Sequence, residues 1–373
     1  MNFNLKFDSM MRKGAKLFYE NLPWFIRDKI RKAFHSRFVP PLYEQLPLSV
    51  PYSLHIDPTN LCNFRCNFCP TGDFELLKTI NRPKGVMPYE LFCKIIDELA
   101  VICKESGQKV NELHLYKDGE PLIHKELGKM IAYAKRENVA HAIQTTTNAA
   151  LLTKERTEEI IDSGLDVIRV SVEHVNDEGY KAITQNYSDY NKVKENVRYL
   201  FEEKVLRKSP LIIKTKIVDI NFDKSVIKKF YDDFAPFSDQ ISVNNLMGWS
   251  NSDAKDFTLG IKIKRGMGNA SKLREKNICP EPFRSLAINF NGQASVCCVD
   301  WSMETVVGDL SKETLNDVWN GAEMKKFRLF HLNGGRNQIK ACSNCHYLKG
   351  FPDHLFLDDK ADYLNRLYNY PNT

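Results

Sequence analysis

The sequence predicts an α/β protein in which a parallel sheet is followed by a smaller, cysteine-rich domain. Over residues 46–245, strand-like apolar segments alternate with amphipathic helix-like segments, which is typical of parallel strands joined by right-handed crossovers. Hydrophobic residues make up 43% and charged residues 27% of the 373 residues, which is ordinary for a globular chain with a sizeable core.

Six strands and five longer helices are expected in this region. The strands are expected at residues 52–57, 112–116, 141–146, 166–172, 211–217 and 240–244. The helices are expected at residues 89–103, 125–137, 154–163, 190–203 and 225–234. Because reactive groups gather at the C-terminal ends of such strands, residues that follow the strands are the first candidates for a site.

Three regions lie outside this alternation. Residues 1–45 form a basic extension, and residues 22–34 within it have the spacing of an amphipathic helix. Such a helix can lie on an anionic membrane surface, but packing on the barrel or on a second subunit is the favoured interpretation. Residues 246–278 are polar and aperiodic and are interpreted as a linker over the mouth of the sheet, and residues 351–373 as a C-terminal tail.

Composition excludes several classes of function. The net charge of +6 comes without a long basic run or an RNA-binding signature, so no nucleic-acid partner is expected. No apolar run reaches membrane-spanning length, and no signal peptide is evident. We therefore expect a cytoplasmic location, peripheral at the inner membrane surface only if residues 22–34 bind lipid, where cysteines bind metal rather than pair.

Cys62, Cys66 and Cys69 form a C-x3-C-x2-C run directly after the first expected strand. Three thiolates on one loop can hold three irons of a [4Fe–4S] cluster and leave the fourth iron open to a small molecule. The alternative is a zinc loop, but the spacing is unusual for zinc and the nearby candidate for a fourth ligand, His55, lies inside a strand.

A second set of cysteines can hold a complete cluster. Its members are Cys279, Cys297, Cys342 and Cys345. Alternating apolar residues around Asn291-Gly292 predict a β-hairpin, which would bring Cys279, before its first strand, near Cys297, on its second. A helical stretch is expected at residues 313–330. A four-cysteine zinc site remains open as the alternative.

The first cysteine run, with Phe68 before its last cysteine, resembles the signature of the radical S-adenosylmethionine (radical SAM) superfamily. The resemblance covers roughly residues 52–347 and implies a partial (β/α)6 barrel. It also implies that SAM binds the open iron and is cleaved to methionine and a 5′-deoxyadenosyl radical, which abstracts a hydrogen atom from substrate. A flavodoxin- or ferredoxin-type reductant is the implied partner.

SAM-binding positions follow from the same resemblance. Gly119, Glu120 and Pro121 are similar to the family's G-G-E-P motif, with Asp118 at the first glycine, and this segment would hold the SAM amino group. Phe68 belongs to the cysteine signature. Further candidates at the ends of later strands are Thr147, Asn148, Ser171, Lys214 and Lys216. The two lysines share parity and so point to one face of their strand.

Residues 279–350 resemble the twitch/SPASM domains that carry an auxiliary [4Fe–4S] cluster. The C-x5-C continuation of a full SPASM domain is absent, since position 351 is Phe, so one auxiliary cluster is implied. The spacing is similar to that of 2-deoxy-scyllo-inosamine dehydrogenase. The likeness extends to aminoglycoside epimerases, which need a cysteine that returns a hydrogen atom, and Cys298 is the candidate for this catalytic role. As a strand neighbour of Cys297 it would face the opposite way, although a small core residue is the alternative.

The expected reaction is hydrogen abstraction from a carbohydrate or cyclitol, as a small molecule or glycan, with dehydrogenation or epimerisation as the outcome. The auxiliary cluster would act as electron acceptor or relay. An oxidation needs a base, and the candidates are Glu173, His174, Arg284 and Asp300. The alternative is peptide or protein modification of the sulfatase-maturase or peptide-maturase type, for which the fuller cysteine set is missing. A non-enzymatic electron carrier would not explain the barrel.

Overall fold

The computed structural model describes residues 40–267 and 273–369. The amphipathic stretch expected at residues 22–34 lies outside these ranges. In the part of the chain that the structure describes, no helix combines the length and the apolar character needed to cross a bilayer.

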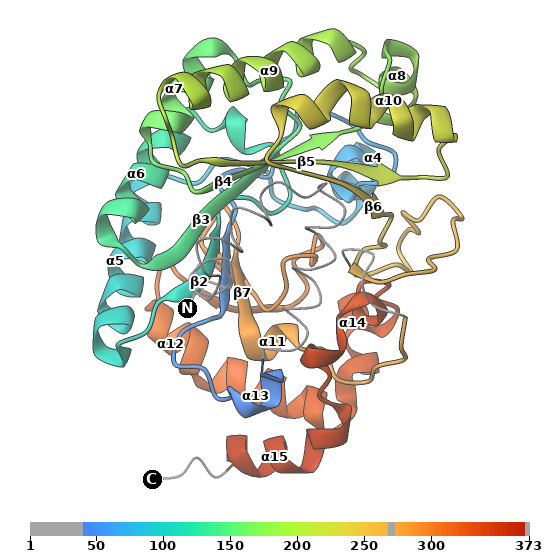
Figure 1. Ribbon diagram of the computed structural model, residues 1–373. Coiled ribbons are helices and arrows are strands. Elements are labelled where there is room, and N and C mark those ends of the chain that lie inside the picture. Colours follow the sequence, from blue (N-terminus) through green and yellow to red (C-terminus); the bar gives the residue numbers. More distant parts are fainter. Residues whose placement is uncertain (1–39, 268–272, 370–373) are drawn as a thin grey trace, which may run out of the picture.

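Within residues 40–267 and 273–369, nine strands form one sheet, in the order β6-β5-β4-β3-β2-β1-β7-β8-β9. The six predicted strands lie side by side and parallel. They are β1 (Ser53–Ile56), β2 (Val110–His114), β3 (Ala140–Thr147), β4 (Val167–Val172), β5 (Ile212–Asp219) and β6 (Gln240–Asn245). In Figure 1 the sheet turns strongly, from β2 and β7 to β5 and β6, which cross them at the top. The prediction of an α/β fold with a parallel sheet is confirmed.

Helices cover the outer face of this sheet (Figure 1). They are α5 (Tyr89–Ser106), α6 (Leu127–Glu137), α7 (Lys154–Asp162), α8 (Asp177–Thr184), α9 (Tyr190–Leu206) and α10 (Lys224–Phe234). The short helix α4 (Phe74–Thr79) follows the cysteine loop and packs elsewhere, with Leu77 in a small core beside Phe257 and Trp301. The short helices α4 and α8 were not predicted. The side chains of Asp73 and Asn176 cap their first turns by accepting backbone N–H groups.

The main core lies between the helices and the sheet. In α5, Ile95, Ile96 and Leu99 recur at helical spacing and are fully buried, and they pack in one cluster with Leu113 of β2 and Ile143 of β3. Each such side chain contributes about 1.5–3 kcal/mol through burial. The outer face of the strands is therefore scaffold, which leaves the inner face free for polar side chains.

The C-terminal hairpin continues the same sheet. β7 (Ser285–Ile288) pairs in parallel with β1, and β8 (Gln293–Ser295) and β9 (Val306–Asp309) follow in antiparallel fashion. The expected turn is present, since Gly292 has φ 88°, a conformation that favours glycine. The placement of Cys297 on the second strand is wrong, because β8 already ends at Ser295.

The helical stretch expected at residues 313–330 is divided in two. It forms α12 (Leu315–Asn320) and α13 (Ala322–Leu332), which are separated at Gly321. An added Cβ at Gly321 would lie 1.8 Å from the Asp317 carbonyl oxygen, so the sharp bend requires glycine. The remaining helices are α11 (Glu281–Arg284), α14 (Lys340–Ser343) and α15 (Ala361–Asn369).

Residues 351–369 pack against the body of the protein. Leu364 and Tyr368 of α15 are buried in a second core with Phe283 of α11 and with Leu42 and Leu46, close to the start of the described chain. The short 3-10 helices η1 (Leu42–Glu44) and η8 (Asp353–Leu355) contact each other. The two ends of the described chain thus meet on one side of the sheet.

Candidate active site

The first cysteine set lies on the loop after β1. The thiols of Cys62, Cys66 and Cys69 are near enough to interact electrostatically, and burial raises the pKa of all three, that of Cys69 to about 11. A cluster of thiolates in such surroundings needs positive charge, which iron would supply. An added Cβ at Gly72 would lie 2.6 Å from the Cys66 carbonyl oxygen, so glycine allows the loop to fold back on itself.

The second set comes together from three segments: before α11, after β8 and around α14. Its thiols also interact with one another, and burial raises their pKa values. They belong to Cys279, Cys297, Cys342 and Cys345. Among the described residues, no three His, Cys, Asp or Glu side chains already converge on a single metal ion. The soft thiolate donors fit an iron–sulfur cluster at both places.

The segment that follows β2 packs directly on the cysteine loop. Gly119 has no room for a side chain, because an added Cβ would lie 2.2 Å from the Thr59 carbonyl oxygen and 2.4 Å from that of Leu61. The Glu120 backbone N–H donates to the Leu61 carbonyl oxygen at 2.8 Å. Pro121 then starts a 3-10 turn. The glycine of the expected motif is therefore required by close backbone packing.

Glu120 joins this segment to the end of β3. Its carboxylate accepts hydrogen bonds from the Thr147 hydroxyl and the Asn148 backbone N–H, both at 2.7 Å. Burial raises the pKa of Glu120 to about 7. The Asn148 side chain in turn donates to the Asn63 side chain in the cysteine loop at 2.8 Å. Two predicted SAM-binding segments and the cysteine loop are thus one hydrogen-bonded unit.

Asp118, which stands where the family motif has glycine, belongs to a buried charge network. Its carboxylate pairs with Arg82 and, at 2.5 Å, with Lys117. Lys117 also donates to the Asp300 carbonyl oxygen at 2.9 Å, which links the barrel to the C-terminal domain. Burial and the Asp118 charge raise the pKa of the neighbouring Asp57 to about 7.

Strands β4 and β5 present a row of charged side chains to the inner face. Arg169 and Ser171 are register partners of Lys214 and Lys216, and Glu173 follows at the end of β4. Burial raises the pKa of Glu173 to about 7 and lowers that of Lys216. The charge of each group partly offsets this effect by favouring the ionised form of the other. Glu173 also interacts with the Cys66 thiol, so it faces the cysteine loop.

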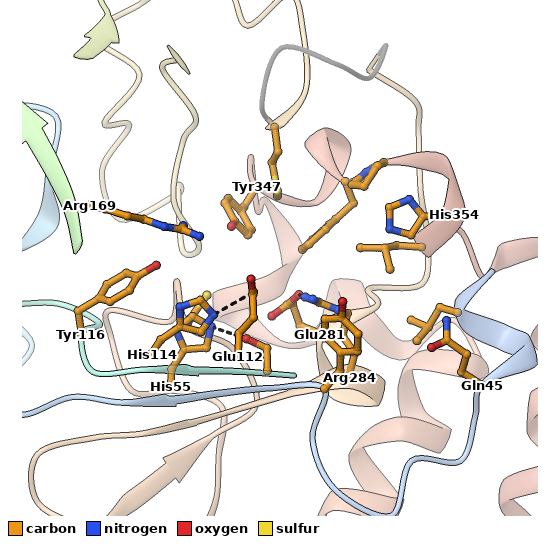
Figure 2. Close-up of a pocket in the computed structure, with 18 residues that line it drawn as sticks. Gln45, His55, Glu112, His114, Tyr116, Arg169, Glu281, Arg284, Tyr347 and His354 are labelled. Atoms are coloured by element: carbon orange, nitrogen blue, oxygen red, sulfur yellow. Dashed lines mark hydrogen bonds and ion pairs between the residues drawn. The ribbon is translucent and has the colours of Figure 1, made fainter. Parts of the chain in front are cut away.

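A cavity of about 420 Å³ opens between the sheet and the C-terminal domain (Figure 2). Two of the predicted catalytic residues, Cys298 and Arg284, line it. Glu173 and Asp300 are not among its lining residues. The Asp300 carboxylate instead accepts hydrogen bonds from the backbone and hydroxyl of Thr305, so it holds a turn together.

A stacked pair of histidines forms part of the cavity wall. The rings of His55 and His114 lie 4.1 Å apart, 10° from parallel, and His114 Nε2 lies 3.4 Å from the Glu112 carboxylate (Figure 2). Burial lowers the pKa of both imidazoles, so both are neutral near pH 7. Burial opposes ionisation of Glu112, but the contact with His114 and nearby arginines outweigh it and lower its pKa.

Tyr116 lies beside this pair and Arg169 lies above it, and both line the cavity (Figure 2). Within the described structure, Arg169 Nε has no hydrogen-bond partner. The Tyr116 ring packs edge-on against both histidine rings, and burial raises its pKa. These polar groups were missed in the sequence, although His55 was weighed as a zinc ligand. The available signal was Glu112 and His114, two residues apart on one strand and so on one face.

Cys298 lies where the cavity meets the second cysteine set. Its thiol is beside the His55 ring and also beside the Cys297 thiol. The argument that Cys297 and Cys298 face opposite ways as strand neighbours is therefore wrong, because both follow the end of β8 and lie in a turn. Cys298 nevertheless faces the cavity.

The radical SAM superfamily model matches residues 56–217, and that of the SPASM iron–sulfur cluster-binding domain matches residues 279–346. The chain thus carries a radical SAM domain followed by a SPASM/twitch domain. These two domains imply a [4Fe–4S] cluster, an auxiliary cluster and SAM. The three-cysteine loop and the four-cysteine set fall in the first and the second match, respectively.

Among curated proteins, GTP 3′,8-cyclase of Clostridium botulinum is 29% identical over 39% of this chain and 41% of its own length. The tungsten-containing aldehyde ferredoxin oxidoreductase cofactor-modifying protein of Pyrococcus furiosus is 29% identical over 32% of this chain and 30% of its own. The chain therefore spans less than half the length of these relatives.

Two solved structures share the fold over most of the chain. BtrN, crystallised with AdoMet and 2-DOIA, is 14% identical, with a TM-score of 0.50 over 79% of this chain and 93% of its own. SuiB of Streptococcus suis, crystallised with SAM, is 16% identical, with a TM-score of 0.55 over 87% of this chain and 77% of its own. At these identities the likeness concerns the fold.

Proposed function

We propose that this radical SAM enzyme oxidises or epimerises a secondary alcohol of an uncharged carbohydrate or cyclitol bound in the cavity. The observation that carries the proposal is the lining of that cavity, where hydrogen-bonding and aromatic side chains converge beside Cys298, next to the second cysteine set. Its volume of about 420 Å³ lies within the usual range for small-molecule sites, about 300–1,000 Å³.

The lining offers both kinds of hydrogen-bonding partner that a polyol needs. The Glu112 carboxylate, whose side chain is 39% exposed, can accept from hydroxyl groups while His114 fixes its position. Arg169, with an unused donor, can bind hydroxyl or ring oxygens from the other side. Tyr116 and Tyr347 add aromatic surface that can pack against the C–H face of a ring.

The charges around the cavity favour an uncharged substrate. Arg169 and Arg284 are balanced by Glu112 and Glu281, the latter paired with Arg284 at 2.7 Å, and both histidines are neutral. An anion in this place would be buried without a cation of its own, which is costly. The GTP of the cyclase relatives, with its triphosphate, therefore fits poorly.

When bound, SAM and the open cluster supply the 5′-deoxyadenosyl radical that removes a hydrogen atom from a carbinol carbon, and the auxiliary cluster supplies an acceptor for one electron. Oxidation to the ketone also releases the hydroxyl proton. The neutral imidazole of His114 or His55 can accept it, and Glu112 stabilises the cation that forms. Epimerisation instead needs a hydrogen atom from the opposite face, which the Cys298 thiol can donate.

The test is transfer of deuterium from substrate into 5′-deoxyadenosine, measured by mass spectrometry after anaerobic reconstitution with iron, sulfide, dithionite and SAM. Carbon-deuterated D-glucose, N-acetylglucosamine and myo-inositol are compared with deuterated GTP and a deuterated peptide. We expect transfer from a polyol and its loss in Cys62→Ala. Glu112→Gln should reduce deuterium transfer while the bound iron stays the same. Lys129→Gln, the control at an exposed residue, should leave deuterium transfer unchanged. Deuterium transfer from GTP or from the peptide, with none from any of the polyols, would contradict the proposal.

The same assay in deuterated water separates the two outcomes. Solvent deuterium on the product carbon, lost in Cys298→Ala, indicates epimerisation through an exchangeable thiol. A ketone without solvent label indicates oxidation. We also propose that a flavodoxin- or ferredoxin-type protein reduces the clusters in the cytoplasm, where thiols stay reduced.

A further inference from the structure

The segment interpreted from the sequence as a linker connects the two cysteine loops through one residue. The indole Nε1 of Trp249 donates a hydrogen bond to the Phe68 carbonyl oxygen at 3.0 Å. The backbone N–H of His346 donates to the Trp249 carbonyl oxygen at 3.3 Å. Phe68 directly precedes Cys69, and His346 directly follows Cys345. A single tryptophan therefore touches both loops.

Neighbouring residues fix this segment to the auxiliary side. The Ser250 hydroxyl donates to the Val299 carbonyl oxygen at 2.6 Å, and the Trp301 indole donates to the Ser250 carbonyl oxygen at 2.8 Å. The Asn251 backbone N–H donates to the Ala341 carbonyl oxygen at 2.9 Å. These bonds join the segment to residues near Cys297 and next to Cys342. They therefore hold the backbone of Trp249 on the auxiliary side, while its side chain extends to the first cysteine loop.

The ring of Trp249 is also held by packing. It lies against a small core formed by Leu77, Phe257 and Trp301, which is separate from the main core. Gly248 brings the backbone close to His346, since an added Cβ there would lie 2.4 Å from that side chain. Both the indole and the backbone of Trp249 therefore have fixed positions relative to the two loops.

We propose that Trp249 is a positioning residue that sets the separation of the two clusters and provides a bonded route for one electron between them. From Phe68 to His346, the route consists of two hydrogen bonds and the covalent frame of Trp249, including a conjugated ring. The step moves one electron from a reduced cluster to an oxidised one, and no bond forms or breaks. It requires the two clusters but does not depend on the identity of the substrate.

A second contact between the barrel and the auxiliary loop runs through Lys117, whose ammonium donates to the Asp300 carbonyl oxygen. This link passes along a saturated side chain and then reaches the neighbourhood of Cys69 through Asp118 and Thr71. The Trp249 route contains fewer intervening residues, because its two hydrogen bonds reach the immediate neighbours of Cys69 and Cys345. Trp249 is therefore the more direct connection between the two loops.

The experiment uses the full chain with both clusters reconstituted and a photoreduced flavin supplying less than one electron per chain. Freeze-quench electron paramagnetic resonance then follows how the electron distributes between the clusters, and SAM identifies the open cluster because only its signal changes on binding. We expect Trp249→Phe, which keeps a ring but loses the N–H, to slow redistribution several-fold with the same final distribution. Trp319→Phe is the matched control, since this buried indole donates to the Leu48 carbonyl oxygen instead.

Equal redistribution rates in Trp249→Phe and the wild type would overturn the proposal, and so would equal slowing in Trp319→Phe. Iron and sulfide are counted for each variant. If Trp249→Phe does not retain both clusters, Trp249→His is measured instead, because it keeps a ring N–H in a smaller side chain. Weaker spin–spin interaction between the two reduced clusters in either Trp249 variant would support the positioning role, and unchanged interaction would exclude it.

Discussion

Replacing Arg82 with methionine should destabilise the folded protein by about 3 kcal/mol, because a buried carboxylate then loses one of its two cations. The side chains of Arg82 and Asp118 are each 1% exposed, and that of Lys117 is fully buried. Removal of one partner from a buried ion pair costs about 3–5 kcal/mol. The lower end applies here because Lys117 remains 2.5 Å from the Asp118 carboxylate.

Removal of the carboxylate instead should cost less, about 1–2 kcal/mol, through lost hydrogen bonds. In Asp118→Asn, the pKa of Asp57 falls, because burial and the Asp118 charge had raised it to about 7. Asp57 then ionises and replaces the missing charge beside the two cations. In the wild type, Asp57 holds a proton in the folded state between its ordinary pKa of 3.8 and about 7, so its contribution to stability is lost as the pH rises through this window. That loss should shrink in Asp118→Asn.

The measurement is anaerobic urea unfolding of iron-replete protein, followed by tryptophan fluorescence at several pH values. Arg198→Met is the control, because Arg198 pairs with Glu195 on the surface, where the two side chains are 46% and 54% exposed. It should change the free energy of unfolding by less than about 0.5 kcal/mol. The reasoning fails if Arg82→Met costs no more than Arg198→Met, or less than Asp118→Asn.

Three further changes give independent tests. Gly119→Ala should lower the iron bound by the three-cysteine loop, seen by elemental analysis, because the added Cβ would lie 2.2 Å from a carbonyl oxygen of the loop; full iron loading would contradict this. His331→Leu should make the folded protein less sensitive to acid. Burial lowers the pKa of His331 to about 3, so below its ordinary pKa of 6.5 the proton binds the unfolded state, and stability falls by about 1.4 kcal/mol per pH unit. Acid unfolding of the variant and the wild type would detect the difference. Glu112→Gln should move the acid limb of the kcat/KM profile to lower pH. Burial lowers the pKa of His114 and the Glu112 carboxylate raises it, so removal of the carboxylate lowers this pKa further. An unmoved limb would exclude His114 as the base.

The predicted strands and longer helices follow from local patterns, and the structure contains all of them with small shifts; β2, for example, begins at Val110 rather than at residue 112. The pairing of β7 with β1 could not be predicted, because it joins segments more than two hundred residues apart and leaves no periodic signal in either. The break between α12 and α13 was readable in principle at Gly321, a weak helix former.

The cysteine loops carried the prediction of the site because their spacing is local and specific. The cavity could not be predicted from the sequence, because its residues are far apart along the chain. His55, Glu112 and Arg169 come from three strands and are brought together by the register of the sheet. Asp300 shows the converse error. Asp300 was named among the candidate bases, but both of its carboxylate oxygens accept hydrogen bonds within a turn.

The meeting of residues 42–46 with residues 351–368 beside the cavity has a consequence for the order in which the protein is made. Leu42 and Gln45 form one part of the cavity lining, and Phe351, Pro352, His354 and Leu355 form another. A growing chain therefore completes the three-cysteine loop and the parallel sheet long before α15 can dock on α13. We expect the substrate compartment to be the last part to form, so that iron and sulfide can be inserted while the site still lies open. A chain cut before residue 351 would keep both cysteine sets but lose the cover of its cavity.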